Sequence, residues 1–394
     1  MNVLHINYSD HRSGAYLAMW GLHESLMQQG IQSRVLLLNQ SNGSRPGQYV
    51  YWDFIAGQGF EKLQQWVRNY RLSRQQQAIR QDARTRGLLF SFSRTPYRIH
   101  KHPLFNWADI IHLHNVPGFL DWQSFFGVCT KKVVWTVHDC GPFDDGFHTR
   151  YAVPEDLYTK ARQKNIRVKK NSILSKKTTI EWVFPSRYHM KRAATRQFPA
   201  TPASVIFHPV DPAVFYPEHK EKALQALGLD VRQRYLLFAA SGLNRKEKGL
   251  RLLLEQLPLL RETGYRLLAL GESPPPEIPA DVILCGSVND AASMRLYYSA
   301  ADFLLSPSYE ESFGLSLAES VLCGTPVISR PVGIAPELGT DHVHMAGDES
   351  DDAYVKKLAE VLKNPPLRPA APFPAETFSS TVLANRYLEL YLRP

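Results

Sequence analysis

Short apolar segments alternate with helical segments along most of the chain, and this alternation restricts the fold more than any other feature. The first half opens with an apolar run at 3–7, continues with a helical pattern from Leu17 to Met27, and returns to an apolar run at 33–38. Two strands joined by a helix favour parallel pairing, because parallel neighbours need a long crossover connection. Later strands of the same sheet are expected at 109–113, 133–137 and 182–185.

The second half repeats this pattern after a proline-rich passage at 208–217, which is the natural linker. Strands are expected at 235–240, 265–270, 281–285, 302–306 and 326–329, with helices at 249–260, 290–300 and 314–323. A closing helix is expected from about Ala375 to Leu392. The sequence therefore predicts an α/β fold with two doubly wound parallel sheets, and a ligand at the carboxyl ends of their strands, in the cleft between the domains.

Composition excludes several classes of protein. The 394 residues are enough for two domains, and 44% apolar with 21% charged residues is typical of globular chains. No apolar run reaches the roughly 18–20 residues of a membrane span, and the first residues lack the basic region of a signal peptide. The four cysteines show no CxxC spacing, which indicates neither a zinc site nor a disulfide framework. We expect a reduced, cytoplasmic protein.

Charge is distributed unevenly. Residues 1–200 carry 28 Lys and Arg against 13 Asp and Glu, whereas residues 201–394 carry 18 against 24. The basic half either meets a polyanion or an anionic membrane surface, or is simply a solvated surface that aids solubility. A basic helix is expected at 61–86, and its partial apolar face either lies on a membrane or packs on its own domain. That face consists of Leu63, Trp66, Val67, Tyr70 and Leu72.

The strongest candidate for a ligand site is the segment 306–319, which is rich in polar and acidic residues. Here a strand ends, a polar loop follows and a helix begins near Gly314. The free N–H groups at a helix start can bind an anion or a sugar hydroxyl. The carboxylates of Glu311 in the loop and Glu319 in the helix can accept hydrogen bonds from pairs of hydroxyl groups on different parts of one extended ligand. Alternatively, Glu310 and Glu311 only complement the helix dipole and Glu319 is a surface residue.

The pattern Glu311-x-Phe313-Gly314-x-x-x-x-Glu319, followed by segments at 323–328 and 332–337, resembles the signature of retaining glycosyltransferases of family 4. These enzymes have the GT-B fold, with two Rossmann-like domains. Further resemblance lies in Ser13-Gly14-Ala15, in 135–139, in 185–188 and in the linker at 208–217. The pair His138-Asp139, with His148 beyond it, is similar to a subset found in bacterial exopolysaccharide and O-antigen assembly.

The resemblance implies roles for individual residues. The carboxylate matching Glu311 bonds the donor sugar and the one matching Glu319 bonds the ribose, while Lys248 matches a lysine that meets the donor phosphates. The family arginine is replaced by Leu243, so Arg245 is expected to reach the same phosphate. Catalytic roles are implied for His138, Glu311, Lys248 and Arg245. The other expected donor contacts are Gly14, Ser241, Gly242, Ser287, Val288, Ser312, Phe313, Gly314, Leu315 and Glu319, and the expected acceptor contacts are Asp139 and His148.

No metal site is expected. His112 and His114 alternate on one strand face, but no carboxylate or third ligand is expected in register with them. Asp144-Asp145 lacks the spacing of a catalytic metal motif. No cofactor is implied either, because the nucleotide sugar, linked to UDP or GDP, is a substrate.

The resemblance thus implies a retaining, metal-independent hexosyltransferase of cell-surface polysaccharide biosynthesis. A first domain at 1–208, completed by the closing helix at 376–394, is expected to bind a glycan or lipid-linked glycan, and a second at 209–375 the nucleotide sugar. The expected location is the cytoplasm, at the inner face of the membrane. Alternatives are a nucleotide-sugar epimerase or a phosphorylase of the same fold, or a non-catalytic sugar-binding scaffold, which the leucine at 243 keeps open.

Overall fold

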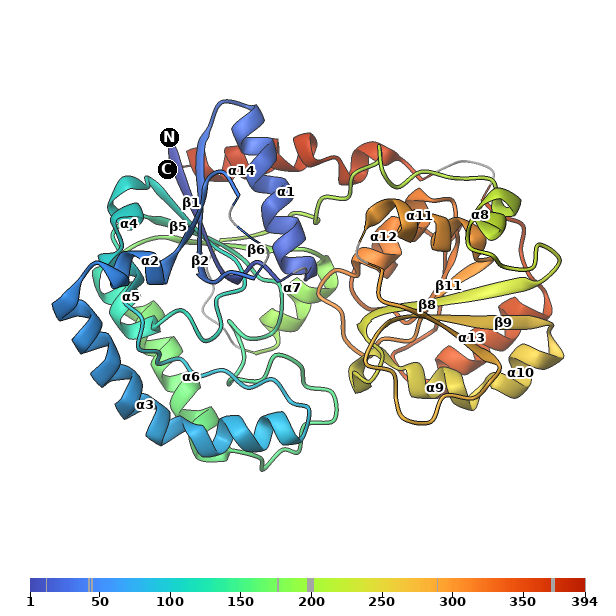
Figure 1. Cartoon of the computed structure of the whole chain (residues 1–394), viewed down its shortest axis with the longest axis horizontal. Helices are drawn as coiled ribbons and strands as arrows, with labels where there is room; N and C mark the ends of the chain where they lie inside the picture. Colours follow the sequence, from blue (N-terminus) through green and yellow to red (C-terminus); the bar gives the residue numbers. More distant parts are fainter. Residues whose placement is uncertain are drawn as a thin grey trace. The chain divides into compact units, whose positions relative to one another are not determined.

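The computed structural model describes residues 1–11, 13–41, 43, 45–175, 177–196, 202–288, 290–369 and 373–393 (Figure 1). The chain divides into two compact units. Unit 1 comprises Met1–Phe207 and Leu383–Pro394, and unit 2 comprises His208–Val382. Both are α/β units, as the alternation of the sequence predicts.

Unit 1 contains a seven-stranded sheet in which every strand pair is parallel. In spatial order the strands are β3 (Gln48–Val50), β2 (Gln32–Asn39), β1 (Asn2–Ser9), β4 (Ile110–Leu113), β5 (Lys132–Thr136), β6 (Ile180–Phe184) and β7 (Ala203–Val205). The strand order reverses direction between β1 and β4. In open α/β sheets, ligands bind beyond the carboxyl ends of the strands at such a switch point.

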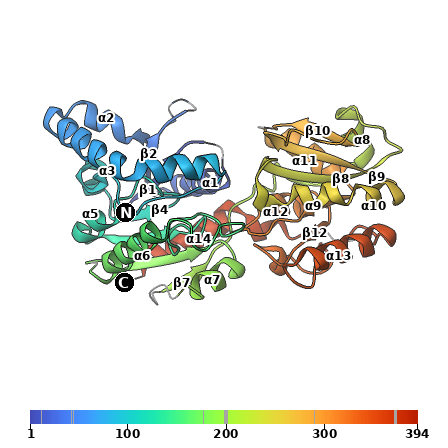
Figure 2. The same cartoon turned by 90° about the horizontal axis from the view of Figure 1, so that it is seen from below.

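Helices cover both faces of this sheet (Figure 2). One face packs against α1 (Gly14–Gln28) and α14 (Ser380–Leu392), with Val3, Ile110 and Val134 among the buried contacts. The opposite face contributes Leu4, Ile111 and Val133 to a larger core. That core includes side chains from α2 (Tyr51–Ala56), α4 (Pro103–Trp107), α5 (Trp122–Val128), α6 (Thr159–Leu174) and α7 (Arg187–Ala194).

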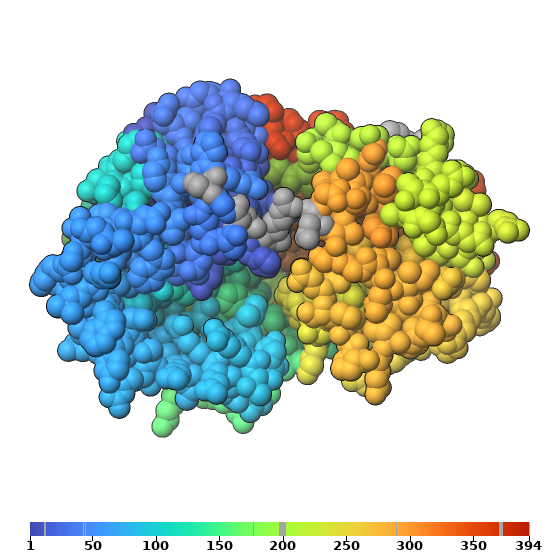
Figure 3. Space-filling model, viewed as in Figure 1, coloured from blue at the N-terminus to red at the C-terminus, as the bar shows by residue number. Residues whose placement is uncertain are grey.

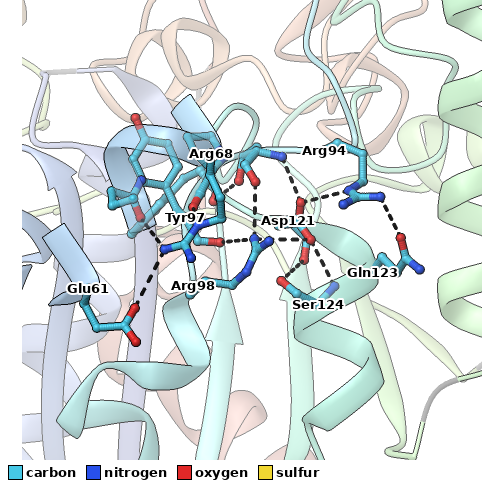
Figure 4. Close-up of polar contacts among 12 residues, drawn as sticks. Glu61, Arg68, Arg94, Tyr97, Arg98, Asp121, Gln123 and Ser124 are labelled. Atoms are coloured by element: carbon cyan, nitrogen blue, oxygen red, sulfur yellow. Dashed lines mark hydrogen bonds and ion pairs between the residues drawn. The ribbon is translucent and has the colours of Figure 1, made fainter. Parts of the chain in front are cut away.

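A long helix, α3 (Gly59–Thr85), lies outside these layers and is held by polar contacts (Figure 4). Arg68 donates from Nε to the Pro96 carbonyl at 3.0 Å. The following segment is fixed by the buried Asp121, which accepts from the Thr95 N–H at 3.0 Å and from Arg94 Nε at 3.2 Å. Asp121 is also the N-cap of α5, because its Oδ1 accepts from the Ser124 N–H. One carboxylate therefore ties this segment to the core.

Unit 2 contains a six-stranded parallel sheet with the same kind of order. Its strands are β10 (Val282–Gly286), β9 (Tyr265–Glu272), β8 (Arg234–Gly242), β11 (Phe303–Ser306), β12 (Val327–Ser329) and β13 (Val343–Met345). Its helices are α8 (Lys220–Ala226), α9 (Leu250–Glu255), α10 (Leu257–Glu262), α11 (Ala291–Ala300), α12 (Leu315–Leu322) and α13 (Asp351–Lys363). The switch point of this sheet lies between β8 and β11.

Two predicted helices differ from those observed. The helix expected over 249–260 is two helices, because Pro258 stands at the start of α10 and its nitrogen cannot continue the hydrogen bonding of α9. The closing helix begins at Ser380, after a separate 3-10 turn at Ala375–Phe378. Among the described residues, no helix combines the length and apolarity needed to cross a bilayer.

Replacing Leu390 by alanine tests the contribution of α14 to unit 1. Leu390 is 1% exposed, so Leu390→Ala should lower the free energy of unfolding by about 2–5 kcal/mol. Leu392→Ala is the matched control, because Leu392 on the same helix is 73% exposed. Urea titrations followed by tryptophan fluorescence report on unit 1 alone, since all seven tryptophans precede residue 208. Equal midpoints for the two variants would contradict the packing described.

Candidate functional site

The loops after β8 and β11 meet at the switch point of unit 2. Lys248 follows β8 and Glu311 follows β11, and Lys248 Nζ lies 2.6 Å from Glu311 Oε1. Both side chains are mostly buried, at 19% and 16% exposure. A charge-assisted hydrogen bond of this length fixes an ammonium and a carboxylate beside each other where a ligand of an open α/β sheet is expected. The structure thus brings together two residues that are 63 positions apart.

Two glycines permit this close approach of loops. Gly249 has a φ of 79°, and a Cβ there would stand 2.7 Å from the Pro307 carbonyl oxygen. Gly333 has a φ of 59°, and a Cβ there would stand 2.2 Å from the Phe313 oxygen. Any other residue at either position meets both a strained backbone and a collision with main-chain atoms.

A buried arginine, which the sequence analysis did not identify, supports the loop that carries Glu311. Arg330 is fully buried, and its Nε donates to the Pro307 carbonyl at 2.9 Å. Its guanidinium also lies 4.2 Å from the ring centre of Tyr309 and pairs with Asp351. An arginine directly after the apolar strand β12 was the available signal in the sequence.

The helix α12 begins where the signature predicts. Gly314, with a φ of 95°, is its N-cap, so Ser312 and Leu315 lie on either side of the helix start. Phe313 is 1% exposed and packs 4.9 Å from the His208 ring and 6.1 Å from the Phe378 ring, measured between centroids. Its side chain therefore serves the core of unit 2, and any contact with a ligand must come from its main chain.

Glu319 lies in α12 and accepts a hydrogen bond from the Tyr298 hydroxyl at 2.7 Å. Burial raises the pKa of this carboxyl to about 7, although the bond from Tyr298 opposes the shift. Tyr298 is fully buried in α11 and was not predicted as part of the site. It orients the carboxylate that the sequence singles out.

Arg245 and Lys248, in the cationic loop after β8, do not share one partner. Leu243, at the position of the family arginine, is 2% exposed and belongs to the core. Arg245 Nε lies 2.6 Å from Glu247 Oε1, and Arg245 Nη1 lies 3.3 Å from Ser241 Oγ beside Gly242. Arg245 and Lys248 thus pair with different carboxylates.

Two further expected donor contacts follow the strand β10. Ser287 is exposed, and its Oγ lies 3.3 Å from Glu272 Oε1 at the end of β9. Val288 is the next residue and is half-buried. Both therefore lie at the carboxyl edge of the unit 2 sheet.

In unit 1, the expected acceptor residues form a connected group after β5. Asp139 Oδ2 lies 2.8 Å from His148 Nδ1, and the Gly141 N–H donates to Asp139 Oδ1 at 2.7 Å. Burial opposes ionisation of Asp139, but His148 and the Gly141 N–H outweigh it and lower its pKa to about 2. Gly14 is the first residue of α1, whose N-cap is Ser13.

His138 lies just beyond the end of β5, and burial lowers its pKa to about 4 although Asp139 opposes the shift. The imidazole is therefore neutral at pH 7. Its Nε2 lies 3.2 Å from Nδ1 of His114, the residue that follows β4. The structure thus places His138 and Asp139 at the carboxyl edge of the unit 1 sheet.

The expectation that no third ligand stands in register with His112 and His114 is wrong. Parallel pairing of β1 with β4 sets His5 opposite His112. One nitrogen of each of the three buried rings lies within 4.8 Å of the others. However, both nitrogens of His112 are already bonded, to Tyr391 Oη at 2.7 Å and to Thr136 Oγ1 at 2.8 Å.

The two adjacent aspartates of unit 1, Asp144 and Asp145, are engaged by arginines. Arg150 Nε lies 2.7 Å from Asp144 Oδ2, and Arg162 Nε lies 2.7 Å from Asp145 Oδ2. These ion pairs assign the two carboxylates a structural role in the loop after β5.

Comparisons with known proteins found matches to glycosyltransferases. The family model described as Glycosyl transferases group 1 matches residues 233–364, within unit 2. D-inositol 3-phosphate glycosyltransferase of Segniliparus rotundus is 31% identical over 190 residues, which cover 43% of this chain and 42% of that protein. The match thus spans less than half of that relative. An uncharacterized 41.2 kDa protein in the cps region of Klebsiella pneumoniae is 26% identical over 303 residues, covering 73% of this chain and 79% of that protein.

Two solved structures extend the likeness to the whole chain. WaaG, a glycosyltransferase involved in lipopolysaccharide biosynthesis, has a TM-score of 0.62 and 18% identity, covering 100% of both chains. Anabaena Alr3699/HepE, in complex with UDP and glucose, has a TM-score of 0.62 and 16% identity over 99% of both chains. At these identities the likeness establishes the fold. With the two parallel sheets it shows the GT-B fold, and the match to the group 1 glycosyltransferase model is confined to residues 233–364 of unit 2.

Proposed function

We propose that this protein is a hexosyltransferase that moves a sugar from a nucleotide sugar to a glycan or lipid-linked glycan in cell-surface polysaccharide biosynthesis. The observation that carries the proposal is the pair of Lys248 and Glu311 at the switch point of unit 2. An ammonium can neutralise the charge that builds on a departing phosphate, and a carboxylate beside it can accept hydrogen bonds from sugar hydroxyls.

The donor is proposed to be linked to UDP or GDP and to bind unit 2. Anabaena HepE, which has the same fold, binds UDP and glucose. Glu319, oriented by Tyr298, offers its carboxylate to the ribose hydroxyls. Arg245, exposed in the loop after β8, supplies the second cation for the diphosphate in place of the leucine at 243. The transfer is proposed to retain the anomeric configuration, and to use neither a metal ion nor a cofactor.

The acceptor is proposed to bind unit 1. A hollow of about 390 Å³ runs along the second half of α3, and its lining includes Gln76, Gln77, Arg80 and Arg84. Arg80 donates to Gln76 Oε1 at 2.7 Å, and among the described residues no carboxylate forms an ion pair with it. Amides and an uncompensated guanidinium suit a glycan that carries phosphate or carboxylate groups.

The site of action is proposed to be the inner face of the cytoplasmic membrane. Four large apolar residues of α3 are mostly exposed: Phe60 at 72%, Leu63 at 58%, Trp66 at 63% and Tyr70 at 52%. The segment that forms α3 lies on the surface of unit 1 (Figure 3). The same helix buries polar side chains instead, including Gln65 and Gln76. A helix that turns its aromatic side chains outward among basic residues suits the surface of an anionic bilayer.

Nucleotide binding tests the assignment of unit 2. Scanning calorimetry with UDP, GDP, ADP or CMP, in the presence of EDTA, should show a raised melting temperature with one nucleotide. A ligand at about 100 times its dissociation constant adds about 2.7 kcal/mol. Lys248→Ala and Glu319→Ala should lose the increase, whereas Lys246→Ala, an exposed lysine of the same loop, should keep it. If no nucleotide raises the melting temperature of the folded protein, the proposed function is wrong.

The raised pKa of Glu319 predicts that the free energy of unfolding of the ligand-free protein falls as the pH rises. The pKa of the Glu319 carboxyl is about 7 in the folded state and near 4.3 in the unfolded state. The folded state therefore holds the proton more tightly, and the stability that this gives in acid is lost as the pH rises through 7. Glu319→Gln should therefore be more stable than the wild type by about 3–4 kcal/mol at pH 8 and equal to it below pH 4. Glu255→Gln, at an exposed glutamate, is the control. A stability difference that does not vary with pH would exclude a buried titration.

Vesicle binding tests the outward face of α3. Replacing Phe60 and Trp66 together by serine should weaken binding to phosphatidylglycerol vesicles about 10-fold or more, because two large apolar side chains are lost from the contact. Flotation assays measure the bound fraction. Leu174→Ser is the control, since Leu174 of the same unit is 77% exposed on another helix. Equal binding to neutral and anionic vesicles would contradict the proposed surface.

A further inference from the structure

A serine, a histidine and an aspartate of unit 1 are joined by hydrogen bonds in one relay. Ser91 Oγ lies 2.7 Å from His148 Nε2, and His148 Nδ1 lies 2.8 Å from Asp139 Oδ2. A hydroxyl bonded to one imidazole nitrogen, with a carboxylate on the other nitrogen, is the arrangement of an activated serine nucleophile. Geometry identifies this arrangement, because the order of the three residues in the chain differs between unrelated folds.

The main chain places Ser91 and His148 side by side. The Ser91 N–H donates to the Gly146 carbonyl at 2.8 Å. The His148 N–H donates to the Leu89 carbonyl at 3.2 Å, so the two segments pair in an antiparallel sense. From α6, Asn165 Nδ2 donates to the Ser91 carbonyl at 2.9 Å. Both main-chain groups of Ser91 are therefore fixed, which orients its side chain before any ligand binds.

Asp139 sets the direction of the relay. It is ionised at pH 7, because its pKa is about 2 although burial opposes ionisation. A carboxylate only accepts hydrogen bonds, so Nδ1 of His148 carries a proton. In the neutral imidazole, Nε2 is then the acceptor for the Ser91 hydroxyl. This tautomer is the one in which an imidazole takes a proton from a serine.

A small hollow of about 20 Å³ adjoins Ser91 at the carboxyl edge of the unit 1 sheet. Its lining also includes Pro117 and Gly118 after β4, and Gly141 and Pro142 after β5. A space of this volume holds about one water-sized group. It therefore suits the smallest acyl groups, of which acetyl is the common one.

Lys169 of α6 adds a buried positive charge to the same hollow. Its ammonium donates to the main-chain carbonyls of Gly141 and Asp144, the second at 2.7 Å. Burial lowers the pKa of Lys169 to about 8, against the charges of nearby aspartates, so the ammonium is charged at pH 7. A fixed cation in the hollow that the serine lines can stabilise the oxyanion that forms when a carbonyl is attacked.

We propose that Ser91 is the nucleophile of an acyl-transfer site in unit 1, with His148 as its base and Asp139 as the residue that orients the base. The substrates are acetyl esters of alcohols, sugar hydroxyls included. This activity goes beyond sugar transfer and requires neither a nucleotide sugar nor any residue of unit 2.

The reaction consists of two transfers through the same base. Ser91 Oγ attacks the carbonyl carbon of the ester, and its proton passes to His148 Nε2. The bond between the carbonyl carbon and the alcohol oxygen then breaks, and the alcohol leaves with the proton from Nε2. Water repeats the attack on the acetyl-serine in the same way, which releases acetate and restores the free hydroxyl.

The test uses p-nitrophenyl acetate with the full chain. Release of p-nitrophenolate should begin with a burst above the rate in buffer, as the acetyl group is transferred to the protein. Peptide mass spectrometry after an acid quench should find that acetyl group on Ser91. This measurement is made on the wild type and so does not depend on the folding of a variant.

Variants separate catalysis from packing. Ser91→Ala should lower the rate about 100-fold or more. Ser124→Ala is the matched control and should leave the rate unchanged, because the Ser124 hydroxyl of the same unit bonds a main-chain carbonyl instead of an imidazole. His148→Ala should be as slow as Ser91→Ala, and added imidazole should restore part of the rate. A histidine that only holds the structure together would not respond to imidazole.

Three results would overturn the proposal. They are an acetyl group found on lysines but not on Ser91, a Ser91→Ala rate equal to that of the wild type, and a wild-type rate no higher than that of buffer. The relay would then serve only to join the two segments that it connects. None of these results bears on sugar transfer, which the calorimetry with nucleotides tests separately.

Discussion

Parallel pairing is the constraint on which both units depend. When every strand runs the same way, all carboxyl ends meet at one edge, and residues far apart in the sequence are brought to that edge without any direct attraction between them. Lys248 and Glu311 meet in unit 2 for this reason, as do His114 and His138 in unit 1. The Lys248–Glu311 pair and the His114–His138 contact are therefore consequences of strand order, refined by glycines and buried polar groups.

Much of this organisation can be predicted from the sequence, because it is local. The strands, the start of α12 and the signature carboxylates Glu311 and Glu319 follow from periodicity and motif. Residues that act across the fold were missed. Tyr298 and Arg330 support the site from other elements, and the one sequence signal was the place of Arg330 directly after an apolar strand. His5 was missed because its position opposite His112 depends on strand register, which the sequence does not specify.

The helix α3 shows a second limit of prediction from the sequence, which concerns the orientation of a helix. Of the five residues predicted to form its apolar face, Leu63, Trp66 and Tyr70 are exposed, whereas Val67 and Leu72 are half-buried. Periodicity does not say which face meets the protein. In unit 1 the polar face is turned inward, because Gln65 and Gln76 find partners in Tyr51 and in the Arg94 carbonyl. Hydrogen bonding therefore decides the orientation of this helix, against the usual rule for amphipathic helices.

The position of α14 has a consequence for synthesis of the chain. Residues 383–391 complete the core on one face of the unit 1 sheet, yet the ribosome makes them after the whole of unit 2. Unit 1 is therefore the first to be translated and the last to be finished. Until α14 is synthesised, the apolar side chains that it covers, Val3, Ile110 and Val134 among them, lack this partner, so that face of the sheet is incomplete throughout the synthesis of unit 2.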